Sequence, residues 1–299
     1  MRNVSSIVAT IKKAYVSRKF KRRNRSIMGD MSLTILLGLF GLFSVWPLIF
    51  IINNAFKPLN EIFIFPPRLF VMSPTLTNFQ DLFIVIGNSW VPITRYIFNT
   101  FFITAVGTLG SVIIGSMAAF PLAKYVFPGS KTMSKLIVYS LMFNGTVTAL
   151  PNYIIMSKLH MIDTYWALLL PSIGGTLGLF LMMNFMVQVP DALIEAAKID
   201  GAKELTIFWR IMMPLSRSAW ITLIILSFQS LWGTTGGGVI FTEKLKPVSY
   251  ALSQIVNAGI ARTGVASAVT LIMLVVPVVV FVISQSNVIS TMATTGIKE

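Results

Sequence analysis

The chain has 299 residues, of which 55% are hydrophobic and only 11% are charged, and its mean hydropathy is +0.78. Because soluble domains carry about 25% charged residues, this composition excludes an ordinary soluble domain and indicates an integral membrane protein. The formal net charge of +14 is compatible with nucleic-acid binding, but the positions of the basic residues suggest a simpler explanation.

Cysteine is absent and His160 is the single histidine. These counts exclude disulfides, thiolate catalysis, cysteine-type zinc sites and the H-E-x-x-H motif. The sequence also contains no Gly-Lys pair and therefore no P-loop for nucleotide phosphates. We accordingly expect no catalytic residue, no metal site and no cofactor bound by this chain.

Residues 1–30 form a tail that holds nine basic residues directly before the first apolar stretch. Each Lys or Arg near an anionic membrane surface gains about 1 kcal/mol. We interpret the tail as a cytoplasmic segment that contacts membrane lipid, with a specific partner as the alternative, and we expect no nucleic-acid binding. The apolar stretch that follows is too long for the h-region of a signal peptide.

Six stretches are apolar and long enough to cross a membrane, which requires about 20 helical residues. They make residues 31–299 an all-α transmembrane domain with six predicted spans, at about 32–54, 96–121, 136–157, 166–188, 217–235 and 267–288. With a cytoplasmic N-terminus, the inside segments hold 17 basic residues and the outside loops hold seven. This excess predicts that both termini and residues 189–216 are cytoplasmic.

The first outside loop, Asn53–Arg95, is Pro-punctuated and aromatic, and we expect it to form a small external cap. The third and fourth spans contain polar groups and helix breakers, which are tolerated at membrane depth only against protein or water. Two interpretations stay open, a translocation pathway or packing between helices. The candidate pathway residues are Asn144, Tyr153, Phe180, Asn184 and Gln188.

Four acids and four bases between Asp191 and Arg217 interrupt the apolar chain. Proline and an acid at 190–191 favour a helix start, and Gly201 is suited to the left-handed position that ends a helix. We expect a second short helix over Ala202–Met212 and a bend into the fifth span at Pro214. In that helix Phe208, Trp209 and Ile211 should face the bundle.

The residue pattern of these two helices is compatible with a projection that docks on a partner protein or with an amphipathic element that lies at the membrane interface without a partner. Their spacing E-A-A-x-x-D-G-A-x(8)-I-x-x-P resembles the EAA loop of ABC-importer permeases, which docks into the ATPase subunit. The positions that carry the resemblance, and to which it assigns coupling to an ATPase, are Glu195, Ala196, Ala197, Asp200, Gly201, Ala202, Ile211 and Pro214.

The resemblance extends to Pro151–Pro171, whose I-D-T-x-x-A-L-x-L-P run is similar to the maltose-type carbohydrate permeases, in particular the shorter, G-type partner. It implies a type I importer fold in a bacterial cytoplasmic membrane and a heterodimer with a second permease subunit. It also implies two ATPase subunits, which hold the ATP and Mg²⁺, and an extracellular solute-binding protein. The outside loop Gly233–Gly264, with Gly236, Gly237 and Gly238, is then expected to contact that binding protein.

The resemblance implies transport of a carbohydrate, in oligosaccharide form, by a subunit that is not itself an enzyme. One alternative is an ABC-importer permease whose transported solute is an amino acid, a peptide or an oxyanion. A second alternative is a secondary transporter or channel that works without ATP. It would need intramembrane acids or bases for ion coupling, and the interiors of the six predicted spans contain none.

Overall fold

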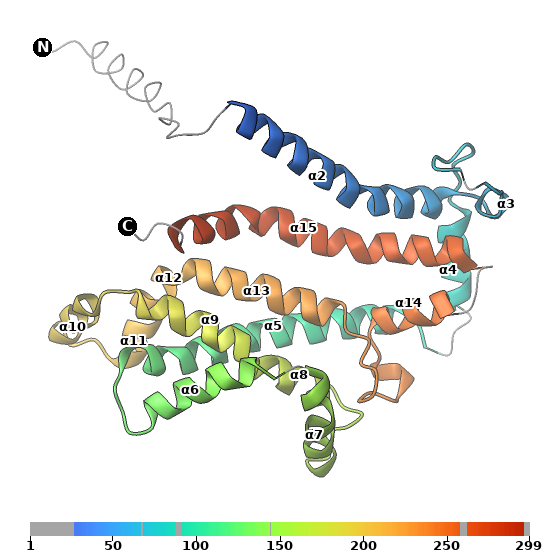
Figure 1. Ribbon diagram of the computed structural model, residues 1–299. Coiled ribbons are helices and arrows are strands. Elements are labelled where there is room, and N and C mark those ends of the chain that lie inside the picture. Colours follow the sequence, from blue (N-terminus) through green and yellow to red (C-terminus); the bar gives the residue numbers. More distant parts are fainter. Residues whose placement is uncertain (1–26, 67, 88–90, 144, 258–261, 296–299) are drawn as a thin grey trace, which may run out of the picture. The chain divides into compact units, whose positions relative to one another are not determined.

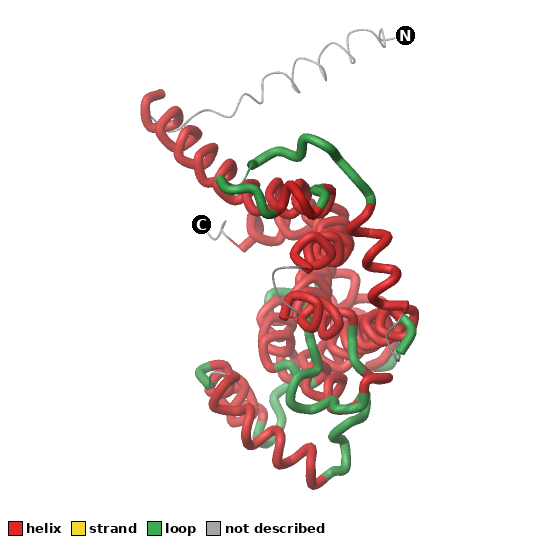
Figure 2. The backbone as a smooth tube through the Cα atoms, turned by 90° about the vertical axis from the view of Figure 1, so that its right-hand side faces the viewer, coloured by secondary structure: helices red, strands yellow, loops and turns green. Residues whose placement is uncertain are grey.

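The computed structural model describes residues 27–66, 68–87, 91–143, 145–257 and 262–295. Within these residues every regular element is a helix or a helical turn (Figures 1 and 2). The chain divides after Phe50 into two units. The described part of the first unit belongs to α2 (Ile27–Phe56), and the second unit contains every other element.

Four helical stretches in the described residues are long and apolar enough to cross a membrane, namely Met28–Phe56, Ile93–Lys124, Trp166–Val187 and Thr263–Ser284. They correspond to α2, to α5 (Ile93–Lys124), to α8 (Trp166–Ile173) with α9 (Thr176–Val187), and to the first part of α15 (Thr263–Thr295). The first, second, fourth and sixth predicted spans are thus present as apolar helices.

The other two predicted spans differ from expectation. The third is not one helix over 136–157, because α6 ends at Leu141 (Ser130–Leu141) and α7 begins at Gly145 (Gly145–Lys158). Only proline destabilises a helix interior more than glycine does. The break lies directly before such a residue, Gly145. The fifth corresponds to α13 (Arg217–Trp232). This helix is long and apolar enough to cross a membrane only when it is counted together with the helical stretch Glu204–Leu215, and the two are bent by 79° relative to each other.

α5 lies at the centre of the second unit and packs against α8, α9 and α13 (Figure 1). Gly107 permits this close approach, since a Cβ on it would stand 2.5 Å from Leu231 and 2.9 Å from the hydroxyl of Ser172. Gly107 thus lets the backbone of α5 approach α8 and α13 closely, as small residues do in membrane helix bundles.

The two ends of α5 carry different structures. At its Lys124 end lie the short helices α10 (Asp191–Ile199), α11 (Glu204–Ile207) and α12 (Met213–Leu215), with a π-helical turn at Phe208–Met212. At its Ile93 end lie a 3₁₀ turn (Glu243–Leu245) and α14 (Val248–Asn257). A helix of 32 residues is about 48 Å long. Residues 189–216 and 233–247 therefore lie at opposite ends of the bundle, separated by about the length of α5 (Figure 1).

The predicted cap contains α3 (Leu59–Ile62) and α4 (Thr77–Gly87). The Glu61 carboxylate accepts the backbone N–H groups of Met72 at 3.1 Å and of Ser73 at 2.9 Å. Asn78 donates to the carbonyl oxygen of Lys57 at 2.7 Å. These bonds give the loop a fixed structure, and Leu82 of α4 packs into an apolar cluster with residues of α14 and α15.

Candidate functional site

Residues 189–216, called here the coupling segment after the role that the resemblance assigns to them, form α10 and a second helix, the continuous stretch Glu204–Leu215, joined by a tight turn. α10 begins at Asp191 directly after Pro190, and Gly201 has a φ of +76°. Its N–H donates to the carbonyl of Lys198 at 3.0 Å, and the N–H of Ala202 donates to that of Ala197 at 2.9 Å. The predicted left-handed glycine is confirmed, while the second helix begins at Glu204 instead of Ala202.

The coupling segment is rooted in the helix bundle by apolar side chains. Ile194 of α10 and Ile207, Phe208 and Met212 of the second helix are buried in one cluster with Phe120 of α5. Ile211 packs partly against the same cluster. The expectation that Trp209 faces the bundle is wrong, since 48% of it is exposed. Adjacent helical residues point about 100° apart, so Trp209 turns away when Phe208 faces the core.

Lys124, at the end of α5, fixes the start of the coupling segment. Its side chain is almost fully buried, and its ammonium lies 2.7 Å from the carboxylate of Asp191. It also donates to the carbonyl oxygens of Val187, at 3.3 Å, and of Val189. A cation at these carbonyls complements the negative end of α9.

A second polar cluster spans the turn at Gly201. The ammonium of Lys198 lies 3.0 Å from the carboxylate of Glu204 and 4.6 Å from the centre of the Tyr125 ring. The Tyr125 hydroxyl donates to Glu204 at 2.5 Å. This hydrogen bond, followed by that from Lys198, lowers the pKa of Glu204. The bond with Glu204 raises the pKa of Lys198, and burial raises the pKa of Tyr125.

Most of the predicted coupling residues are exposed. Glu195, Ala196, Asp200 and Gly201 are exposed, and Ala197 and Ala202 are half-buried beneath them. Pro214 is exposed at the far end of the second helix, where the chain bends toward α13. Ile199, with 86% of its surface exposed, adds a large apolar side chain beside the turn. Small side chains, the acids Glu195 and Asp200 and the exposed aliphatic group of Ile199 are therefore all accessible at or near the turn.

The structure brings together only some of the predicted pathway residues. Phe180 and Asn184 of α9 and Gln188, which caps this helix, follow one another at four-residue spacing. Asn184 donates to the carbonyl of Phe180 at 2.8 Å, and Gln188 donates to that of Asn184 at 3.3 Å. Tyr153 lies on α7 and is exposed. Asn144 is outside the described residues.

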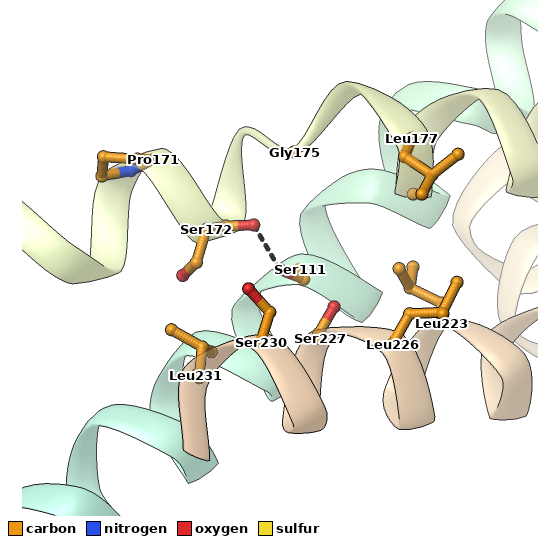
Figure 3. A pocket seen from close by; sticks show the side chains of 11 residues that line it. Ser111, Pro171, Ser172, Gly175, Leu177, Leu223, Leu226, Ser227, Ser230 and Leu231 are labelled. Carbon is orange, nitrogen blue, oxygen red and sulfur yellow. Dashed lines mark hydrogen bonds between the residues drawn. The ribbon is translucent and has the colours of Figure 1, made fainter. Parts of the chain in front are cut away.

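The sequence analysis missed a cavity of about 220 Å³ where α5, α13 and the junction of α8 and α9 meet. Its polar groups are the hydroxyls of Ser111, Ser172, Ser227 and Ser230, and Figure 3 shows Ser227 and Ser230 directed into it. Ser111 donates to the carbonyl of Ser172. Serines three residues apart in an apolar helix were the available signal.

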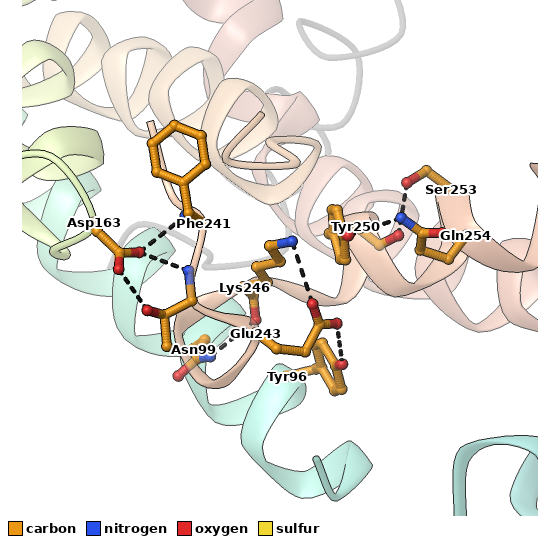
Figure 4. Close-up of polar contacts among 10 residues, drawn as sticks. Tyr96, Asn99, Asp163, Phe241, Glu243, Lys246, Tyr250, Ser253 and Gln254 are labelled. Atoms are coloured by element: carbon orange, nitrogen blue, oxygen red, sulfur yellow. Dashed lines mark hydrogen bonds and ion pairs between the residues drawn. The ribbon is translucent and has the colours of Figure 1, made fainter. Parts of the chain in front are cut away.

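At the opposite end, the 233–247 loop carries the predicted glycines at its tip. Gly236 and Gly238 have φ values of +67° and +85°. The N–H of Ile240 donates back to the carbonyl of Gly236 at 3.0 Å, which closes a turn. The base of the loop is fixed to α5, since Asn99 donates to the carbonyl of Lys246 (Figure 4) and to that of Lys244, both at 2.9 Å.

Comparison with known proteins places the chain in a family. The family model described as binding-protein-dependent transport system inner membrane component matches residues 111–292. The polygalacturonan/rhamnogalacturonan transport system permease YtcP of Bacillus subtilis is 29% identical over 79% of this chain and 80% of its own length. The arabinooligosaccharides transport system permease AraQ of Halalkalibacterium halodurans is 30% identical over 71% of this chain and 75% of its own length.

A crystal structure of a bacterial ABC transporter involved in the import of the acidic polysaccharide alginate contains a chain of the same fold. It aligns with a TM-score of 0.76 and 20% identity, and the match covers 88% of this chain and 99% of the other. The expected importer-permease fold is thereby confirmed. The chain belongs to the family of binding-protein-dependent transport system inner membrane components.

Proposed function

We propose that this chain is one of two membrane-spanning subunits of an ATP-driven, binding-protein-dependent importer of oligosaccharides. The observation that carries this proposal is the coupling segment, a small-residue turn that is rooted in the bundle by Phe208 and Met212 and exposed around Gly201. In a family of binding-protein-dependent transporters, such a projection suits the transfer of motion between a nucleotide-driven subunit and the spanning helices.

The subunit crosses the membrane six times. α2, α5, α8 with α9, and α15 account for four crossings, and α13 for a fifth. The sixth is a broken span made of α6 and α7, which together contain 26 residues, 12 and 14 respectively. About 20 helical residues suffice to cross the hydrocarbon. A break at membrane depth is tolerated where it is buried in protein or lines water.

The coupling segment faces the cytoplasm, together with both chain termini. The count of 17 inside and seven outside basic residues supports this orientation. On that side the exposed turn docks on one of two ATPase subunits, which bind ATP and Mg²⁺. A second permease subunit completes the translocation pathway, and an extracellular binding protein delivers the solute to the 233–247 loop, with Gly237 at its tip.

The cargo is a carbohydrate. The names of the relatives in Bacillus subtilis and Halalkalibacterium halodurans support this choice. So does the chemistry of two surfaces, since sugar hydroxyls are recognised by amides and hydroxyls. One surface is the α9 ladder of Phe180, Asn184 and Gln188, and the other is the hydroxyl-lined cavity at Ser227 and Ser230. We assign both to the pathway.

The test uses the assembled transporter in proteoliposomes. Purified binding protein is loaded with an oligogalacturonide, an arabino-oligosaccharide, a peptide or an amino acid, and the rate of ATP hydrolysis is measured. We expect stimulation with a sugar-loaded binding protein and none with the other two solutes. Stimulation only by binding protein loaded with a peptide or an amino acid would show that the transported solute is not a carbohydrate. ATP hydrolysis that no loaded binding protein stimulates would refute the proposed function.

A further inference from the structure

One carboxylate joins two segments of the chain at the end of the bundle opposite the coupling segment. Asp163 lies in the turn between α7 and α8, 79 residues before Thr242. Its Oδ1 accepts the N–H of Phe241 at 2.9 Å and that of Thr242 at 2.7 Å, and its Oδ2 accepts the Thr242 hydroxyl (Figure 4). Its own N–H donates to the carbonyl of Val239 at 2.8 Å.

The two halves of the 233–247 loop are held by different elements. The second half is tied to α5, where Asn99 donates to Lys244 and Tyr96 donates to Glu243 at 2.6 Å. Among the described residues, the hydrogen bonds from 239–242 to any other part of the bundle all end at Asp163. Residues 239–242 directly follow the glycine tip, so the bonds to Asp163, together with the buried side chain of Ile240, hold the tip in place.

The backbone of the turn suits this role. The N–H of Met161 donates to the carbonyl of Met156 at 2.9 Å, which ends α7, and both His160 and Asp163 have positive φ values, 54° and 61°. Asp tolerates the left-handed region better than most residues with a side chain. Its carboxylate also accepts several hydrogen bonds at once, and the bonds from Thr242 lower its pKa, so it stays ionised.

We infer that Asp163 is a positioning residue for solute delivery, which holds residues 239–242 in the shape that receives the binding protein. This inference rests on the proposed function, in which the 233–247 loop is the docking element. A loop that is ordered before docking loses less conformational freedom when the partner binds. The hydrogen bonds of Asp163 with residues 239–242, called here the clamp, therefore set the affinity for the loaded binding protein. They leave the rate of ATP hydrolysis by the docked transporter unchanged.

The experiment compares three substitutions in the complete transporter. Asp163→Gly removes the acceptors and fits the positive φ. Asp163→Asn keeps an oxygen for the two N–H groups and an amide that can donate to the Thr242 hydroxyl. Asp81→Asn removes a charge from exposed α4 at the same end of the bundle and serves as the matched control. The binding protein is loaded with an oligogalacturonide.

We expect Asp163→Gly to raise the binding-protein concentration for half-maximal ATPase stimulation about tenfold. Its basal and maximal rates should stay within about twofold of wild type. Hydrogen exchange at the Phe241 and Thr242 amides should accelerate about tenfold. Asp163→Asn and Asp81→Asn should resemble wild type in all of these measurements.

Three results would overturn the inference. They are an unchanged half-maximal concentration in Asp163→Gly, an equal defect in Asp163→Asn, or a loss of assembly and basal activity that marks a general folding role. Hydrogen exchange reports on the clamp without any transport. If wild type is not stimulated by its binding protein, the proposed function fails, while the exchange rates still decide whether Asp163 orders the loop.

Discussion

Gly201→Val tests the coupling segment at its turn. Gly201 has a φ of +76°, and no described atom lies within 4 Å of where its Cβ would stand. The substitution therefore meets no clash, and its cost is the backbone strain of a β-branched residue at positive φ, about 1–3 kcal/mol. That energy lowers the population of the native turn roughly 5- to 150-fold, which should uncouple transport or release the ATPase while membrane insertion stays normal.

Two controls separate the shape of this turn from general strain. Gly129 has a φ of +89° and equally open surroundings, but it lies between α5 and α6. Gly129→Val should cost a similar energy and preserve coupling. Gly201→Asn should retain transport, because Asn tolerates the left-handed region. The assay is copurification of the ATPase, with ATP hydrolysis and uptake measured in the same proteoliposomes. Full coupled uptake by Gly201→Val would refute the reasoning.

Three further predictions follow from other contacts. Glu195→Ala should reduce coupled uptake less than Gly201→Val does, because it removes one exposed charge and keeps the turn; equal losses in the same liposome assay would contradict this ranking. Glu204→Gln should lower the melting temperature at neutral pH but not in acid: the folded pKa of Glu204 is lowered, so its contribution is present above the ordinary glutamate pKa and is lost as pH falls through the folded value. The effect should be small and sensitive to salt, since the Lys198–Glu204 pair is exposed, and a melting difference that persists in acid would argue against the pair. Gly107→Ala should destabilise the bundle relative to Gly115→Ala on the same helix, because the nearest atoms to the added Cβ are at 2.5 Å and 3.9 Å respectively; overpacking costs about 1–3 kcal/mol, and equal melting temperatures would contradict it.

Much of the fold can be predicted from the sequence because the membrane constrains it so strongly. The apolar stretches that became α2, α5 and α15 are long and free of charge in their interiors. The third predicted span is divided into α6 and α7, a break that the sequence analysis did not predict because hydropathy averages over a window and does not register the interruption before Gly145.

The candidate site was predictable where it depends on local backbone chemistry. Gly201 follows the last turn of a helix, and a left-handed glycine is the usual way to end one. The contacts of Lys124 with Asp191 and of Tyr125 with Glu204 join residues 67 and 79 positions apart. No periodicity in a single sequence encodes such separations, so these contacts, like those of Asp163, needed the three-dimensional structure.

The central claim is tested most directly by uptake of a labelled oligogalacturonide into proteoliposomes that contain the assembled transporter. Orientation is fixed by labelling Lys198→Cys and Lys244→Cys variants of this cysteine-free chain with an impermeant reagent. We predict accumulation only when ATP is on the side of position 198 and loaded binding protein is on the side of position 244. Accumulation without ATP or without binding protein, or with ATP on the side of position 244, would contradict the account.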